Sequence, residues 1–392
     1  MTYIVGIDIA KYKHDCFIMD EYGEVIRNSF SFSNNSQGFN ELLNVLRSLN
    51  SDKIKIGFEA TGHYAINLKL FLEQNNFSFM ELNPNLVKRF SKATNLRRTK
   101  TDKIDAKLIA NYLTSIKYKS YQGKSYHIYS LKSLTRLREK LVKQRSQQLV
   151  NITNVLDLIF PEFKPFFNNS LKSKTALYIL ENYPSAKKIA NMNINSYHKL
   201  ISEIRGPKFS CKKFNDLKDL AKNTIGQSND ILEFELLSYI HLYNELDSKI
   251  NDCEKKIVDI MKNIHTNITS IPGIGIISAA SIYSEFGGNF ELFSSANQLL
   301  AYAGLDPGIS QSGTMYQTGK MVKHGSGYLR KTLMDVVMTN MIHIPQFNDY
   351  YSKKKSEGKC HRVALSHLVR KLLRVIYHLE IYNISFSYEL LK

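Results

Sequence analysis

The hydrophobic and polar positions in the first third of the chain alternate between a strand pattern and a helix pattern. Three strand-like segments, TYIVGIDIA, HDCFIMDE and EVIRNSFSFS, are separated by turn residues and predict an antiparallel meander. Apolar residues on one side of the segment from Ser36 to about Leu49 predict a helix. IKIGFEA then predicts a fourth strand, Tyr64 to Gln74 a second helix, and FSFMELN a fifth strand. Beyond Pro84 the chain becomes helical and basic.

Two long apolar stripes mark the middle of the chain. Apolar residues recur mostly at steps of three and four from Leu131 to Val155 and again from Ile231 to Ile260. This spacing predicts two long amphipathic helices that pair as a coiled coil. Residues 160–226, between them, hold several prolines and shorter helical patterns, and we expect a small inserted helical domain there. The expected domains are residues 1–125, residues 126–262 with the insert at about 160–226, and residues 263–392.

The order of the predicted elements in the first domain resembles the ribonuclease H or RuvC-like fold. In that fold the central strand and its neighbour present metal-binding acids, and Asp8 and Glu59 stand at the matching places. We therefore expect an α/β domain of the RuvC-like class, a helical coiled-coil middle, and a mostly helical C-terminal domain.

Four acidic residues stand where two strands and a helix would deliver carboxylates to one point. Asp8 lies in the first predicted strand, Glu59 ends the fourth, and Asp102 and Asp105 fall three apart in a helical segment, so both share one helical face. Converging carboxylates need cations between them, and magnesium prefers carboxylate ligands. Taken singly, these residues could be an acid at a strand edge, an exposed acid, or a helix cap at Thr101 and Asp102. Together they predict a site for two magnesium ions.

The charge of the chain indicates an acidic polymer as its partner. Formal net charge is +18 and the pI is near 9.5. One basic run extends from Lys88 to Lys107 and resumes from Lys132 to Arg145, and a second extends from Lys320 to Lys371. Solvated helix faces are the alternative, but phosphate neutralisation fits two runs that flank candidate motifs. The residues of these runs that we expect to contact nucleic acid are Arg97, Arg98, Lys100, Lys103, Lys320, Lys323, Arg330 and Lys331.

Cysteine usage and hydropathy bear on where the protein works. Cys16, Cys211, Cys253 and Cys360 are scattered and form no CxxC pair, so neither a zinc site nor a disulfide framework is indicated. No uninterrupted apolar run approaches the roughly 20 residues that span a bilayer, and the N-terminus lacks a signal-peptide pattern. We expect a cytoplasmic protein with no membrane partner.

A glycine-rich turn opens the last domain. In ITSIPGIGIISAASIYSEFG, Pro272, Gly273 and Gly275 predict a tight turn between helical stretches. The pattern resembles the helix-hairpin-helix element, whose backbone N–H groups contact DNA phosphates. A plain turn between helices is the alternative.

A serine farther along is the second candidate for chemistry. Ser312 precedes Gly313 in the segment LLAYAGLDPGISQSGT, which predicts a loop with the hydroxyl exposed on a turn. A turn serine that bonds its own backbone is the alternative.

Six motifs in order, GIDIAK, FEATGHY, KTDKIDAKLIA, SIPGIG, AYAGLDPGISQSGT and KHGSGYLRKTL, resemble the DEDD transposases of the insertion-sequence-110 family. These are the bridge-RNA-guided recombinases of bacterial mobile elements. The resemblance covers roughly residues 1–120 and 264–380. It implies that the metal-binding acids are Asp8, Glu59, Asp102 and Asp105, and that Ser312 is the nucleophile.

The same resemblance implies cofactors and partners. The metal would be Mg²⁺, with Mn²⁺ as an alternative. Double-stranded target and donor DNA would be chosen by a structured noncoding guide RNA, the bridge RNA. The protein would form a homo-oligomer, either dimer or tetramer, and would work at the nucleoid in the bacterial cytoplasm.

Two other functions fit the same residues. A metal-dependent RuvC-like nuclease or junction resolvase would use the four acids to activate water, and Ser312 would then be structural. A non-catalytic scaffold would bind DNA or RNA through the glycine-rich turn and the basic helices. Replacing Ser312, or all four acids, separates these functions.

Overall fold

The computed structural model describes residues 1–49, 53–59, 64–94, 102–119, 125–204, 209–305, 307–312, 315–321 and 325–391. Within these ranges, residues 85, 102, 103, 125, 126, 307–312 and 315–321 are described by their backbone alone. The chain forms two compact units. Residues 1–129 with 286–294 make the first unit, and residues 130–285 with 295–392 make the second. The division into three domains stays a prediction.

The first unit is built on a mixed sheet of five strands. Its elements are β1 (Tyr3–Ile9), β2 (Lys13–Asp20), β3 (Val25–Ser33), α1 (Ser36–Ser48), β4 (Ile54–Glu59), α2 (Ile66–Gln74), β5 (Phe79–Leu82), α3 (Pro84–Thr94) and α4 (Asp102–Ser115). The strand order is β3-β2-β1-β4-β5. The meander β1–β2–β3 is antiparallel, whereas β4 pairs in parallel with β1 and β5. The predicted α/β unit is thus confirmed, and its strand order is consistent with the ribonuclease H fold.

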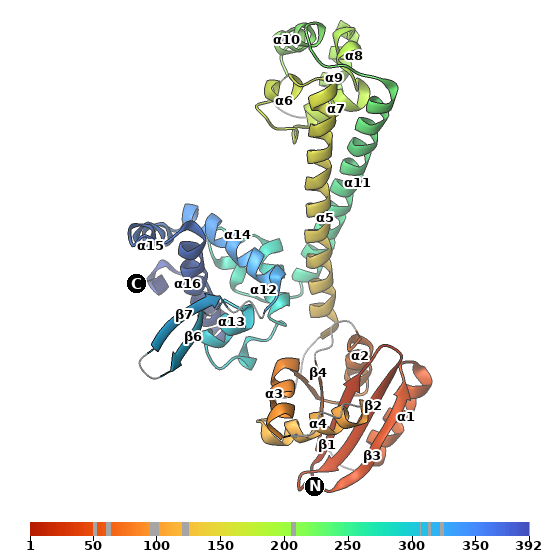
Figure 1. Ribbon diagram of the computed structural model, residues 1–392, viewed down its shortest axis with the longest axis vertical. Coiled ribbons are helices and arrows are strands. Elements are labelled where there is room, and N and C mark those ends of the chain that lie inside the picture. Colours follow the sequence, from red (N-terminus) through yellow and green to blue (C-terminus); the bar gives the residue numbers. More distant parts are fainter. Residues whose placement is uncertain are drawn as a thin grey trace. The chain divides into compact units, whose positions relative to one another are not determined.

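Helices cover both faces of this sheet (Figure 1). Because side chains alternate along a strand, β1 feeds two cores. Val5 and Ile7 belong to one core with residues of α1 and α2, whereas Ile4 belongs to the other with residues of α3 and α4. The register of β1 is therefore strongly specified, since a shift of one residue would move the side chains of each core to the opposite face of the sheet.

Glycines let α4 approach the sheet closely. Gly6 of β1 and Gly57 of β4 are partners in the parallel ladder. A Cβ on Gly6 would collide with the carbonyl oxygen of Ala106 and would lie 2.6 Å from the amide nitrogen of Ala110. A Cβ on Gly57 would lie 2.6 Å from a methyl carbon of Leu113. The absence of a side chain at Gly6 and Gly57 therefore allows the short distance between α4 and the two central strands.

Replacing Gly6 with alanine is expected to destabilise the first unit by about 3 kcal/mol, since rigid helix backbone would have to move to make room. Urea or thermal unfolding measures this cost. Gly275→Ala is the matched control, because a Cβ at Gly275 meets no heavy atom within 4 Å. The control should lose about 1 kcal/mol or less. Equal losses in the two variants would contradict the packing described for α4.

Two long helices and an inserted helical group make up much of the second unit (Figure 1). The elements are α5 (Ser125–Ile159), α6 (Phe163–Phe166), α7 (Lys174–Asn182), α8 (Ala186–Ala190), α9 (Ile194–Glu203), α10 (Cys211–Lys222) and α11 (Asp230–Met261). Ion pairs join α5 to α11, from Arg138 to Glu254 at 2.8 Å and from Arg145 to Asp247. The predicted pair of long helices with a helical insert is therefore present.

The C-terminal segment is mostly helical. Its elements are η1 (Ile268–Ser270), α12 (Ile276–Glu285), η2 (Phe290–Leu292), α13 (Ala296–Ala303), β6 (Pro307–Ser312), β7 (Met315–Met321), α14 (Gly327–His343), α15 (Pro345–Ser356), α16 (His361–Tyr382) and η3 (Tyr388–Leu391). α16 packs against α13, α14 and α15. The segment around Ser312, expected to be a loop, is instead an antiparallel hairpin of β6 and β7. Among the described residues, no helix is sufficiently long and apolar to traverse a bilayer.

Candidate functional site

Asp8 and Glu59 lie side by side at the carboxyl ends of two parallel strands. The β1–β4 ladder pairs Gly6 with Gly57 and Ile7 with Phe58. Asp8 and Glu59 occupy the next step. Because alternate residues share a face, both acids lie on the face where Gly6 and Gly57 contact α4. Both side chains are partly exposed. Two of the four predicted acids are therefore brought together by strand register.

The helix α4 carries the other two predicted acids. Asp105 precedes Ala106, whose carbonyl oxygen lies over Gly6, two residues from Asp8. Asp102 is the first residue of α4, and its side chain lies outside the described part of the chain. The position of α4 over β1 places the start of this helix on the same face of the sheet as Asp8 and Glu59.

Asp15 is an acid on this face that the sequence analysis missed. It is the Cα partner of Asp8 in the antiparallel β1–β2 ladder, and it is only 2% exposed. Ser31 Oγ donates a hydrogen bond of 2.6 Å to Asp15 Oδ1, and Lys13 Nζ lies 3.7 Å from Asp15 Oδ2. Two like charges directly opposite each other destabilise a sheet. A cation near Asp8 would remove that cost. No pattern in the sequence marked Asp15, because its position opposite Asp8 follows from the register of β1 with β2.

The donors on this face have the chemistry that Mg²⁺ prefers, since Asp8, Glu59 and Asp105 offer carboxylate oxygens. In the described residues, no group of three or more Asp, Glu, His or Cys side chains is close enough to hold a metal ion. The predicted set includes the side chain of Asp102, which lies outside those residues. The two-metal site therefore stays a prediction that donor type and strand register support.

Ser312 is the last residue of β6 and pairs with Met315 across the hairpin. It belongs to the second unit, whereas the four acids belong to the first. Its side chain lies outside the described part of the structure. Its role as nucleophile stays a prediction.

The glycine-rich turn is held against α14. Gly273 has a φ of +88°, a conformation that favours glycine. Asn340 Nδ2 donates a hydrogen bond of 2.6 Å to the carbonyl of Pro272, and a Cβ on Gly273 would lie 3.1 Å from His343. The predicted turn between helical stretches is confirmed, and its packing accounts for Gly273. Contact between DNA and the N–H groups of Gly273 and Gly275 stays a prediction.

Several predicted basic contacts lie where side chains are not described. Arg97, Arg98, Lys100 and Lys323 are outside the described residues, and Lys103 and Lys320 are described by backbone alone. Two others have partners within the chain. Arg330 donates to the carbonyls of Gly325 at 2.7 Å and Ala303 at 3.2 Å. Lys331 pairs with Glu139 at 2.9 Å and with Asp335 at 3.0 Å.

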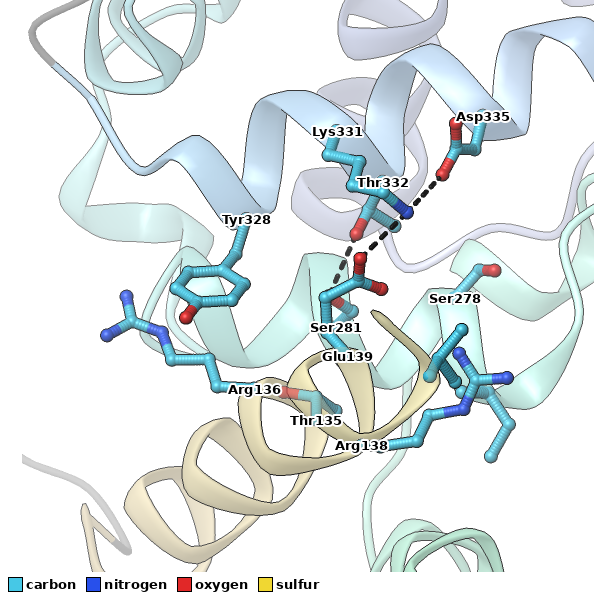
Figure 2. Close-up of a pocket in the computed structure, with 12 residues that line it drawn as sticks. Thr135, Arg136, Arg138, Glu139, Ser278, Ser281, Tyr328, Lys331, Thr332 and Asp335 are labelled. Carbon is cyan, nitrogen blue, oxygen red and sulfur yellow. Dashed lines mark hydrogen bonds and ion pairs between the residues drawn. The ribbon is translucent and has the colours of Figure 1, made fainter. Parts of the chain in front are cut away.

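A polar cavity of about 130 Å³ lies between α5, α12 and α14 (Figure 2). Lys331 bridges Glu139 of α5 and Asp335 of its own helix, while Ser281 and Thr332 bond across it at 3.1 Å. Lys331 is neutralised by these two acids, so the contacts that line the cavity join α5 and α12 to α14 and leave Lys331 no free charge for an anion.

A buried ion pair reinforces the same junction. Glu285, only 1% exposed, accepts from Arg136 Nε at 2.6 Å and from Nη2 at 3.0 Å, and Lys132 Nζ lies 3.7 Å away. Burial alone would raise the pKa of Glu285, but the hydrogen bond from Arg136 and the charges of Lys132 and Arg136 outweigh burial, so the pKa lies below its ordinary value of 4.5.

Glu285→Gln is expected to cost about 2 kcal/mol of stability at neutral pH, because it leaves Arg136 without its carboxylate. This energy is kept small because the Arg136 side chain is partly exposed and solvent screens its charge. Since the pKa of Glu285 is lowered on folding, its ion pair stabilises the fold above pH 4.5 and loses that effect as pH falls further. Denaturant titrations from pH 7 to pH 3.5 should therefore show the two proteins converging below pH 4.5. A difference that stays constant with pH would contradict this.

Comparison with known proteins identifies two family models. The model for DEDD transposases of IS110 type, described as Transposase, matches residues 5–161, and a model described as Transposase IS116/IS110/IS902 family matches residues 265–352. The chain is 25% identical over 385 residues to the pilin gene-inverting protein of Moraxella bovis, covering 96% of this chain and 94% of that protein. It is 23% identical over 351 residues to the transposase for insertion sequence element IS1111A of Coxiella burnetii, covering 88% and 80%. It is 32% identical over 137 residues to the insertion element IS900 uncharacterized 42 kDa protein of Mycobacterium paratuberculosis, covering 34% of each chain.

Proposed function

Because the chain belongs to the IS116/IS110/IS902 family of transposases, we propose that it cuts and rejoins DNA through a covalent bond to Ser312. As a transposase or invertase it acts on DNA and catalyses phosphoryl transfer.

The alignment of Asp8 with Glu59 supports the proposal most strongly. Parallel register sets these acids next to each other at strand ends, and α4 carries Asp102 and Asp105 over the same face. We assign the first unit to the RuvC-like class on the strand order and on this position of the acids. Asp8, Glu59, Asp102 and Asp105 would hold Mg²⁺ or Mn²⁺, which when bound neutralises the scissile phosphate and aligns its oxygens.

Ser312 supplies the nucleophile in this proposal. Its Oγ attacks the scissile phosphorus, an Oγ–P bond forms, and one P–O bond to deoxyribose breaks. The serine proton ends on the departing deoxyribose hydroxyl. In the second half of the reaction, a hydroxyl of the other DNA strand attacks the phosphoserine, a new phosphodiester forms, and Ser312 recovers a proton. The energy of the broken phosphodiester is kept, so no nucleotide cofactor is needed.

The two reacting groups come from different units of the chain. The acids lie in the first unit and Ser312 lies at the end of β6 in the second. We propose that a working site forms when a first unit and a second unit meet on DNA, in a dimer or tetramer. In this arrangement α5 and α11 act as a coiled-coil connection. A structured noncoding RNA would select target and donor DNA by base pairing. The basic residues of the chain can bind the nucleic-acid backbone, but they do not specify a sequence.

An excision and joining assay on the complete element, with its own flanking noncoding DNA, tests the proposal. The serine mechanism requires that Ser312→Ala stop both cleavage and joining. In the nuclease alternative, Ser312→Ala cleaves normally, while replacing the acids stops cleavage. In the scaffold alternative, replacing all four acids leaves function intact. Either of these two outcomes excludes the serine mechanism. The guide proposal further requires RNA to remain on the gently purified protein, and binding of DNA unaffected by that RNA would contradict it.

A further inference from the structure

The helical insert folds around a core of its own at one end of the two long helices (Figure 1). The core joins buried side chains from the end of α5, from α6 to α10 and from the start of α11. Its largest buried members within the insert include Phe163, Leu177, Ile189, Leu200 and Phe214. Because the segment has its own core, its surface residues are held in fixed positions relative to one another.

The surface of this insert is strongly basic. Residues 160–226 contain twelve Lys or Arg and five Asp or Glu, so they hold +7 of the chain's net charge of +18. The insert lies outside the two basic runs noted in the sequence. Six of its lysines are exposed and have no ion-pair partner among the described residues. They are Lys172, Lys174, Lys187, Lys199, Lys212 and Lys213.

No acid of the insert forms an ion pair with these six lysines among the described residues. Glu162 accepts hydrogen bonds from Thr224 and Ile225. Glu181 accepts from Asn244, and Asp219 pairs with Lys222 at 3.0 Å. The six lysines therefore face solvent outside any ion pair of the described residues, on an insert whose five acids leave a net charge of +7.

The placement of three of these lysines costs stability. Lys174 stands in the first turn of α7, Lys212 and Lys213 stand in the first turn of α10, and neither turn holds an acid. A cation near a helix N-terminus opposes the helix dipole by about 0.3–1 kcal/mol. A bound polyanion would be attracted both to these lysines and to the helix N-termini, and that attraction would offset the cost. A solvated helix face needs no such placement, which favours a binding role over a role in solubility alone.

The surface suits the backbone of a duplex better than the bases of a single strand. Single-strand binding relies on exposed aromatic rings on which bases stack. In the described residues of the insert, the exposed large hydrophobic side chains are Ile194, Ile201, Leu220 and Ile225, and none is aromatic. Lysines without aromatic neighbours recognise phosphates regardless of sequence.

We propose that the insert binds the phosphate backbone of duplex DNA through its exposed lysines. This rests on the proposed function, since it assumes that DNA is the substrate, and it adds an anchoring surface separate from the acids and Ser312. The α11 helix has 32 residues and spans about 48 Å. DNA bound by the insert would therefore be contacted about 48 Å from the other end of α11.

Salt dependence of DNA binding tests the role of the lysines. The variant K174Q/K187Q/K212Q/K213Q removes four lysines that form no ion pair among the described residues. The matched control K188Q/K222Q/K255Q/K262Q removes four lysines that already pair with Glu233, Asp219, Asp252 and Asp259. For a 60-base-pair duplex, the slope of log K against log salt should fall by about 3 in the first variant and by less than about 1 in the control. Equal slopes in the two variants would overturn the proposal.

A native cysteine gives a second test that leaves the lysines in place. Cys211 is exposed and precedes Lys212, whereas Cys16 and Cys253 are buried. In S312A protein that also carries C360S, a photoactivatable cross-linker on Cys211 should react with duplex DNA, and added salt should suppress the product. Absence of a DNA product would overturn the proposal. A product with duplex RNA or single-stranded DNA in preference to duplex DNA would overturn its choice of ligand.

The outcomes separate this proposal from the proposed function. Cross-linking uses protein without Ser312, so it does not depend on catalysis. Normal recombination without cross-linking would reject the DNA-binding insert alone. Cross-linking together with full recombination by S312A protein would reject the serine mechanism alone.

Discussion

Replacing Ser312 with alanine is expected to lower the rate of strand exchange by about 10⁴-fold or more, because no other group would form the covalent link. The expected loss covers both cleavage and rejoining. It should occur without loss of fold, since Ser312 is the last residue of β6 and stands at the end of a two-stranded sheet. Recombination frequency and cleavage of supercoiled DNA are the two measurements.

Ser310→Ala is the matched control for this substitution. Ser310 lies two residues earlier on β6, in the same hairpin, and pairs with Gln317. The same hydroxyl is removed from the same strand, so damage to the hairpin would affect both variants. The account expects the Ser310 variant to recombine within about threefold of the unaltered protein. Activity of the Ser312 variant above a tenth of normal would refute the assigned nucleophile.

Replacing Asp8 with asparagine is expected to lower strand exchange by about 10³-fold or more, because the central carboxylate of the proposed metal site is lost. Asparagine has nearly the same shape, and removing one of two facing charges at Asp8 and Asp15 should leave the sheet as stable or more stable. An inactive variant with undiminished thermal stability would therefore indicate a chemical role. Binding of Mn²⁺, followed by electron paramagnetic resonance, should weaken in parallel.

Glu59→Gln should behave like the Asp8 variant, and Glu41→Gln is its control. Glu41 lies on α1, which packs on the opposite face of the sheet, and its side chain is exposed. The control should keep normal activity and normal Mn²⁺ affinity. If Glu59→Gln recombined as well as Glu41→Gln, the pairing of Asp8 with Glu59 would have no part in catalysis.

The first unit was largely predictable from sequence because strand alternation and a one-sided helix leave clear patterns. Val5 and Ile7 alternate with Ile4 and Gly6, and each set faces its own layer of helices. The register of β1 with β4 was not predictable, since matching Gly6 to Gly57 depends on how closely α4 approaches. That register is what brings Asp8 and Glu59 together.

The hairpin that carries Ser312 could not be predicted from its composition. Its segment PGISQSGT is rich in glycine, proline and small polar residues, which ordinarily mark loops. Cross-strand pairing between β6 and β7 overrides that local preference. The partners of Arg330 and Lys331 could not be predicted either. The sequence does not show whether a basic side chain contacts a phosphate, a backbone carbonyl or a carboxylate within the chain.

Asp15 and Glu285 show what one sequence leaves out. Each is an acid in an apolar segment, and each is almost fully buried. Their partners, Ser31 for Asp15 and Arg136 for Glu285, lie 16 and 149 residues away along the chain. Only the fold reveals that Asp15 lies opposite Asp8 across β1 and β2, and that Glu285 joins α5 to α12.

The most direct test of the serine mechanism is to trap the protein on a DNA substrate that is nicked beside the cleavage site, so that the released end diffuses away. After denaturation and protease digestion, mass spectrometry locates the DNA remnant. The account predicts a phosphodeoxyribose adduct on the peptide that contains Ser312, absent when Asp8 is replaced with asparagine. Cleaved DNA with free ends, or an adduct on any other residue, would contradict it.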